Sequence, residues 1–228
     1  MRILILQQSP GIDAGFLKGF LDEEGHEWTQ VDPGGDMQGV SKEGYDALWA
    51  IGGGAVMPSA PAGAAADLVR ELVAENGLPY LGIGFGHHLL AMALGGEVGP
   101  SRAPDAGVAD VQLTEAGATG VLFDDFPEVF PAFQCHEAEI TRLPEGAQVL
   151  VTSPDTAVQA MRWGTRAHSL QFHLDADAAG KTLAAQGIEA SPDERARLLA
   201  DCERHRETFV RLAERLLINW MQTAARTR

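Results

Sequence analysis

The chain has 228 residues, of which 45% are hydrophobic and 21% are charged, which is typical of a globular protein long enough for one large α/β domain. Its formal net charge of −15 opposes contact with nucleic-acid phosphates and anionic lipids, so neither is an expected partner. No segment approaches the roughly 18 apolar residues of a membrane span, and the N-terminus lacks a signal peptide's long apolar core. A cytoplasmic protein is expected by elimination.

The first half of the chain alternates between predicted strands and helices. Phe16, Leu17, Phe20 and Leu21 fall at helical spacing, and Gly25 is a natural helix end. Compact apolar runs indicate buried strands. Strands are predicted over 2–7, 27–31, 45–51 and 80–83, and helices over 13–24, 62–75 and 86–94. This alternation favours a parallel sheet with helices on both faces.

The second half changes character from about Gly107. Strand-like runs separated by turn signals predict antiparallel strands that either extend the first sheet or form a flanking one. They cover residues 108–113, 129–135, 148–152, 157–162 and 168–172. Ser191-Pro192-Asp193-Glu194 matches a capping box and begins a helical stretch that reads as one long helix or two joined ones.

We therefore expect a single domain over residues 1–228 with a helical C-terminal extension at about 191–225. Its fold should be a three-layer α/β sandwich with a mostly parallel central sheet. Ligands of such sheets bind at the carboxyl ends of the strands.

The most informative segment is the turn around Gly84. A buried strand, residues 80–83, breaks into glycines and leads directly into an apolar helix, which is the layout of a nucleophile elbow. The helix N-terminus places N–H groups and a positive dipole end beside the turn, which suits a thiolate or an oxyanion.

At this turn the sequence resembles the class I glutamine amidotransferase family, whose elbow reads roughly Gly-Ile-Cys-x-Gly-x-Gln. This chain has Gly82-Ile83-Gly84-Phe85-Gly86-His87-His88. Three further blocks follow the family's pattern: consecutive glycines at Gly52-Gly53-Gly54, an aromatic and a histidine in Phe133-Gln134-Cys135-His136, and Gln171-Phe172-His173-Leu174-Asp175 in place of Gln-Phe-His-Pro-Glu. The resemblance is to small stand-alone members related to the glutaminase portion of GMP synthase.

The resemblance implies a Cys-His-Glu triad that this chain lacks in part. Gly84 stands at the nucleophile position, His173 is the implied base, and Asp175 is one methylene shorter than the family's glutamate. The implied substrate-binding positions are Gly53, Gly54, Phe85, His88 (in place of glutamine) and His136. A pocket is expected among Gly53, Gly84, His88, His136 and His173.

The departures predict a protein that has lost ordinary glutaminase chemistry and binds a small metabolite or a partner protein. No synthetase region is recognisable, so any amination would need a separate synthetase, and no cofactor is expected. Two alternatives stay open: an enzyme in which His88 and His173 act as acid and base on another substrate, or an engineered Cys-to-Gly variant of an active amidotransferase or γ-glutamyl hydrolase.

The same residues also have structural interpretations. His88 could be a hydrogen-bonded helix residue, His87 a packing or solvent-side residue, and the His173–Asp175 pair an inherited contact. A metal site from His88, His173 and Asp175 has a known ligand set, but no local spacing supports it, and none is predicted. Cys135 is interpreted as a buried structural thiol, with a displaced nucleophile as the alternative. Cys202 is expected to pack against the core from the C-terminal helix.

Overall fold

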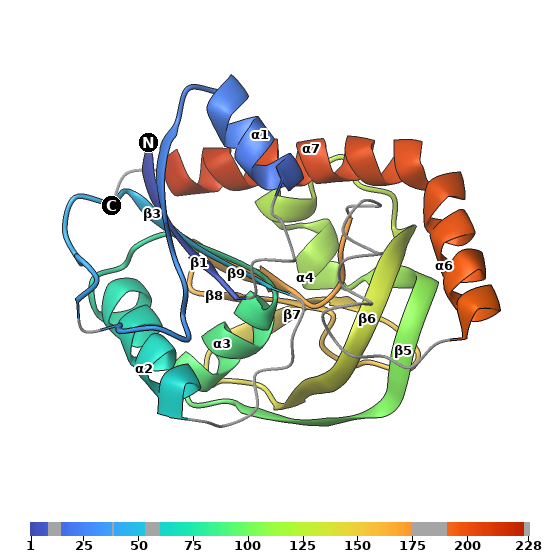
Figure 1. Cartoon of the computed structure of the whole chain (residues 1–228), viewed down its shortest axis with the longest axis horizontal. Helices are drawn as coiled ribbons and strands as arrows, with labels where there is room; N and C mark the ends of the chain where they lie inside the picture. Colours follow the sequence, from blue (N-terminus) through green and yellow to red (C-terminus); the bar gives the residue numbers. More distant parts are fainter. Residues whose placement is uncertain (9–14, 38, 53–59, 175–190, 226–228) are drawn as a thin grey trace.

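The protein is described here by a computed structural model that covers residues 1–8, 15–37, 39–52, 60–174 and 191–225 (Figure 1). Within these ranges one nine-stranded sheet has the order β2-β1-β3-β4-β9-β8-β7-β5-β6. The strands are β1 Arg2–Gln7, β2 Glu27–Val31, β3 Ala47–Gly52, β4 Tyr80–Gly84, β5 Glu97–Leu113, β6 Val129–Arg142, β7 Ala147–Thr152, β8 Ala160–Trp163 and β9 Ala167–Leu170.

The sheet has a parallel part and an antiparallel part. Strands β2, β1, β3, β4 and β9 pair in parallel, whereas β9-β8, β8-β7, β7-β5 and β5-β6 pair antiparallel. The antiparallel strands therefore extend the first sheet, which settles the alternative that the sequence left open. Strands β3 and β4 are buried along their whole length, as expected for parallel strands covered on both faces.

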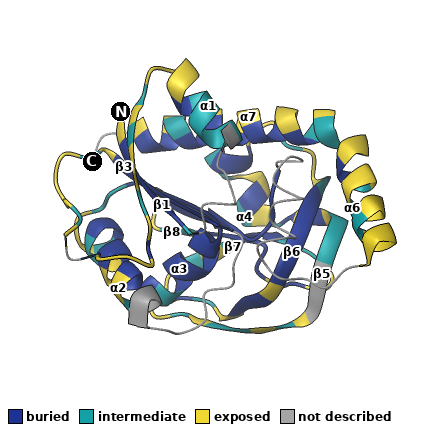
Figure 2. Ribbon diagram, viewed as in Figure 1, coloured by how far each residue is buried: buried dark blue, intermediate teal, exposed yellow. Residues whose placement is uncertain are grey.

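Helices cover both faces of this sheet. On one face lie α1 (Gly15–Glu23), α4 (Glu115–Ala118) and α7 (Arg206–Ala225), and on the other α2 (Ala60–Val69) and α3 (Phe85–Ala93) (Figure 1). Each layer packs on its own apolar core, and the outward faces of α6 (Pro192–Arg204) and α7 are exposed (Figure 2). The predicted three-layer α/β fold is confirmed.

Several boundaries differ from the prediction because pairing and packing extend or divide the predicted elements. Strands β5 and β6 are much longer than the predicted 108–113 and 129–135, since they pair with each other over most of their length despite polar residues. The helix predicted over 62–75 changes to a π-helical turn at Arg70–Glu75. A short 3₁₀ turn at Val121–Phe123 and α4 were not predicted.

The C-terminal stretch is two helices, α6 and α7, which meet at His205. The capping box is present: the Ser191 hydroxyl accepts the Glu194 N–H, and the Glu194 carboxylate accepts the Ser191 N–H. Helix α7 is fixed to the centre of the sheet because Trp220 donates through Nε1 to the carbonyl of Tyr80 at 3.0 Å. Within the described ranges, no helix is long and apolar enough to cross a membrane.

Candidate active site

The turn between β4 and α3 lies at the carboxyl end of a central parallel strand. Gly84 ends β4 and directly precedes α3, with φ 57° and ψ −105°. This positive-φ conformation is one that glycine adopts almost freely and other residues adopt with strain. The first backbone N–H groups of α3 follow it at once, so the turn has the elbow shape that the sequence predicts.

Close backbone contacts require the other glycines of the turn. A Cβ atom on Gly86 would overlap the carbonyl oxygen of Ala50, and one on Gly82 would lie 2.5 Å from the carbonyl oxygen of Gly86. That same Gly86 carbonyl accepts a 2.8 Å hydrogen bond from the hydroxyl of Tyr80, which is fully buried. Helix α3 can therefore sit this close to β3 and β4 only because side chains are absent here.

His173 lies beside the apex of the turn. A Cβ atom built on Gly84 would stand 3.2 Å from both Cε1 and Nε2 of His173, and it would overlap the carbonyl oxygen of Gly52. Two backbone hydrogen bonds with Phe133, of 2.9 and 3.0 Å, hold His173 in place. The structure thus brings His173 and Gly84 together, and any side chain at position 84 would touch the imidazole.

His88 is bound by a residue that the sequence reasoning did not single out. Its Nε2 lies 2.6 Å from Oε1 of Gln171, and its side chain is 1% exposed. Because a carbonyl oxygen only accepts, Nε2 carries the proton and Nδ1 presents a lone pair, which makes no hydrogen bond of ordinary geometry among the described residues. Burial lowers the pKa of His88 to about 4, while Gln171 and the nearby backbone of Ala138 act in the opposite direction. Gln171 had a signal in the sequence, since it opens the Gln171-Phe172-His173 block.

His87 is a packing residue. It is fully buried, with Nδ1 2.8 Å from the Ser169 hydroxyl and Nε2 3.1 Å from the Val158 carbonyl. Burial, and then the neighbouring His88, lower its pKa to about 3, so the ring is neutral at pH 7. With both nitrogens engaged, His87 joins α3 to the sheet.

His136 is the fourth histidine of this region. Its side chain is 3% exposed, neither ring nitrogen has a hydrogen-bond partner among the residues described, and burial lowers its pKa to about 4. Burial also lowers the pKa of His173 to about 4, and a protonated His136 would lower it further. His88, His136 and His173 are therefore neutral neighbours of the elbow.

Other predicted site residues are placed differently or not at all. Phe85 begins α3 and packs in the apolar core between α2, α3 and the sheet, so its predicted ligand contact stays a prediction. Gly53, Gly54 and Asp175 lie outside the described residues, and so does part of the predicted pocket. In the part of the chain that is described, no three His, Cys, Asp or Glu side chains are grouped to hold a metal ion.

Both cysteines belong to the apolar core. Cys135 is 2% exposed and Cys202 is 1% exposed, and burial raises the pKa of Cys202 to about 11. Neither thiol has the exposed, electropositive surroundings of a reactive cysteine. The interpretation of both as structural thiols agrees with this placement.

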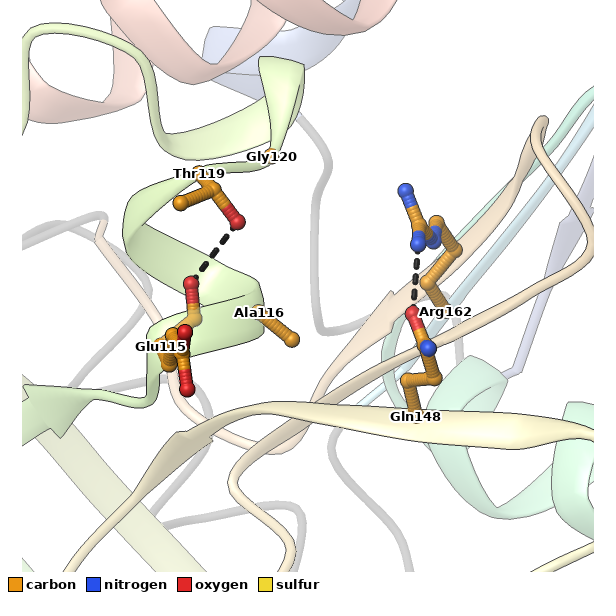
Figure 3. A pocket seen from close by; sticks show the side chains of 6 residues that line it. All are labelled: Glu115, Ala116, Thr119, Gly120, Gln148 and Arg162. Carbon is orange, nitrogen blue, oxygen red and sulfur yellow. Dashed lines mark hydrogen bonds between the residues drawn. The ribbon is translucent and has the colours of Figure 1, made fainter.

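Two surface cavities among the described residues lie around α4, and neither includes Gly84 or the elbow histidines. One has a volume of about 360 Å³ and the other of about 290 Å³. The first lies between α4 and strands β7 and β8, where Arg162 donates to Oε1 of Gln148 at 2.5 Å (Figure 3). It is lined by Glu115, Ala116, Thr119, Gly120, Gln148 and Arg162.

Comparisons with known proteins agree with this geometry. Residues 28–183, more than half of the chain, match the model of the family glutamine amidotransferase class-I. The chain is 35% identical over 116 residues to a glutamine-hydrolysing GMP synthase of Aeropyrum pernix, covering 51% of this chain and 22% of that protein. It is 37% identical over 97 residues to one of the subunits of the glutamine-hydrolysing GMP synthase of Methanocaldococcus jannaschii, covering 42% of this chain and 50% of that one. The aligned region thus spans about a fifth to a half of these relatives.

Solved structures show the same fold over nearly the whole chain. A glutamine amidotransferase from Thermotoga maritima has a TM-score of 0.79 and 23% identity, covering 99% of this chain and 98% of its own. One from Methylobacillus flagellatus has a TM-score of 0.78 and 21% identity, covering 100% and 96%. At these identities the likeness concerns the fold alone. Together with the family match, it means that the chain belongs to the class I glutamine amidotransferase family.

Proposed function

We propose that this protein is a glutamine amidotransferase-like protein that binds a small-molecule ligand at the elbow and does not hydrolyse glutamine through a cysteine. The observation that carries the proposal is Gly84 at the apex of the turn, directly before α3 and beside His173. Covalent acyl transfer needs a nucleophilic side chain there, and glycine has none. Loss of a covalent nucleophile costs many orders of magnitude in rate, which binding and oxyanion stabilisation do not restore.

No other described thiol can take the place of the missing nucleophile. Cys135 and Cys202 are both buried in the apolar core, and the raised pKa of Cys202 keeps it in the unreactive thiol form. His173 therefore lacks the partner that it would activate in an ordinary member of the family.

The backbone around the elbow supports glycine as the residue for which this turn is built. The position that a Cβ atom on Gly84 would occupy is filled by the carbonyl oxygen of Gly52. A cysteine at position 84 would need that carbonyl to move away. The joint presence of Gly84 and His88, where the family has cysteine and glutamine, favours natural divergence over an engineered replacement.

A second function would use the histidines. His88 and His173 are neutral at pH 7 because burial lowers the pKa of each to about 4, so each can accept a proton, but only as a weak base. One of them would accept a proton as base from a substrate other than glutamine and, once protonated, return it as acid. Nε2 of His88 is already bonded to Gln171, which leaves Nδ1 of His88 and the ring of His173 for such a role.

The deciding experiment measures ammonia released from L-glutamine by the purified protein, with Gly84→Cys and His173→Ala beside it. We expect no release by the unaltered chain, alone or with a separately supplied synthetase, which is the partner that any amination would need. Release that disappears in His173→Ala would overturn the proposal. Turnover of another metabolite that is lost in His88→Ala or His173→Ala would establish the second function instead, whereas saturable binding without turnover supports the first. A cytoplasmic location belongs to the same proposal, and fractionation of cells would test it.

A further inference from the structure

Strand β6 carries two buried polar side chains with no hydrogen-bond partner. Gln134 is 0% exposed and His136 is 3% exposed. Among the described residues, neither Nε2 nor Oε1 of Gln134 is bonded, and neither ring nitrogen of His136 is. Buried side-chain polar atoms in folded proteins are almost always bonded, because an unsatisfied one loses its hydration without compensation. Four such atoms on one strand mark a candidate ligand site.

The two side chains lie on the same face of β6, and His136 reaches the elbow histidines. The β5–β6 ladder is regular here, with Gly107 opposite Gln134 and Asp105 opposite His136, so residues two apart share a face. His136 is near enough to lower the pKa of His87, His88 and His173. Gln134 also follows Phe133, whose backbone pairs with His173.

The chemistry of these groups selects the kind of ligand. The amide of Gln134 presents a donor next to an acceptor, which is the arrangement that pairs with a planar group offering an acceptor beside a donor. His136 adds one donor and one acceptor in its neutral form. The charge interactions of the elbow histidines in the described part of the chain are with other histidines, and none is with a lysine or arginine side chain. The N-terminus of α3 supplies only a partial positive charge, so a neutral ligand is favoured over a full anion at Gln134 and His136.

We propose that Gln134 and His136 bind an uncharged planar group that presents a donor beside an acceptor, such as a lactam, a cyclic ureide or the edge of a nucleobase. This names the ligand class of the elbow site and rests on the proposed function for the existence of that site. Gln134 is then a recognition residue that the sequence alone did not mark.

The first test separates a ligand-binding amide from a structural one. In Gln134→Leu the buried amide is replaced by an apolar group of similar size, so the ligand-free protein is expected to unfold at an equal or higher urea concentration than the unaltered chain. The matched control is Asn219→Leu, because Asn219 is a buried amide that donates to the carbonyls of Leu122 and Asp124. That control should unfold at a lower urea concentration. A fall of the Gln134→Leu midpoint similar to that of Asn219→Leu would assign Gln134 to the fold and overturn the proposal.

The second test measures binding by calorimetry with three probes: hydantoin as a neutral cyclic ureide, glutarate as an anion and L-glutamine as a zwitterion. We expect hydantoin to bind the unaltered protein, and its affinity to fall about tenfold or more in Gln134→Leu but not in Asn219→Leu. Absence of hydantoin binding, or glutarate or glutamine binding as tightly, would overturn the ligand class. A crystal structure grown with hydantoin that shows only ordered water on Gln134 and His136 would do the same.

The two proposals fail separately. Ammonia release from glutamine by the unaltered protein would sink the proposed function whatever hydantoin does. Hydantoin binding that is insensitive to Gln134→Leu would sink this inference while leaving the absence of glutaminase activity in place.

Discussion

The close approach at the elbow can be measured by replacing Gly84 with alanine. The Cβ atom would be placed at φ 57° and ψ −105°, a sparsely populated conformation that costs an L-residue about 1–3 kcal/mol. It would also overlap the Gly52 carbonyl and press on His173, and overpacking of a dense interior costs about 1–3 kcal/mol. Gly84→Ala is therefore expected to lower the free energy of unfolding by about 2–6 kcal/mol, the sum of these two effects.

Gly95→Ala supplies the control for conformational strain alone. Gly95 has a similar positive φ of 80°, but a Cβ atom there would meet nothing within 4 Å. Its cost should stay near the strain value of about 1–2 kcal/mol. Urea denaturation of both variants and the unaltered protein gives the comparison. If Gly84→Ala costs no more than Gly95→Ala, the Gly52 carbonyl does not restrict the elbow, and the structural support for a native glycine fails.

Three further predictions concern Gly84, the hydrogen bond of Tyr80 and the buried histidines. Gly84→Cys should be destabilised like Gly84→Ala and release no ammonia from glutamine, because its Cβ atom meets the same Gly52 carbonyl; a rate typical of an active amidotransferase would contradict this. Tyr80→Phe should cost about 1–3 kcal/mol in urea denaturation, since it leaves the Gly86 carbonyl without its buried donor, and an unchanged midpoint would speak against that bond. Burial holds the pKa of five histidines (His87, His88, His136, His168 and His173) at about 3 to 4, below the unfolded value of 6.5. The unfolded chain thus binds more protons, so their stabilising effect is complete above pH 6.5 and is lost as the pH falls toward 4. Near pH 5, unfolding should take up about four to five protons, and His168→Gln should remove about one of them from the measured slope.

The elements that the sequence predicted well are those whose signal is local. The apolar runs of β1, β3 and β4 have no competing interpretation, because strands buried on both faces need continuous hydrophobic residues. The elbow could be placed because a strand, spaced glycines and an apolar helix occur without interruption. The capping box at Ser191 was equally explicit, since its residue types and spacing define it.

The parts that the sequence did not predict depend on contacts between distant residues. The bond between His88 and Gln171 joins positions 83 residues apart, and no local pattern marks it. The extra length of β5 and β6 comes from their mutual pairing, which overrides the polar residues within them. The unsatisfied amide of Gln134 is invisible in the sequence because burial, not residue type, makes it unusual.

The shape of the elbow follows from packing and does not by itself indicate catalysis. Gly82 and Gly86 are required by the close contact of α3 with β3 and β4, and the Tyr80 hydroxyl on β4 donates a hydrogen bond to the Gly86 carbonyl on α3. The carbonyl of Tyr80 in turn accepts a hydrogen bond from Trp220 on α7. These interactions hold the turn in place whether or not residue 84 has a side chain. Evidence for function must therefore come from groups that packing leaves unsatisfied. Near the elbow, within the described part of this chain, His136 and Gln134 each have both side-chain polar atoms unbonded, which is why we propose ligand binding rather than acyl transfer for this site.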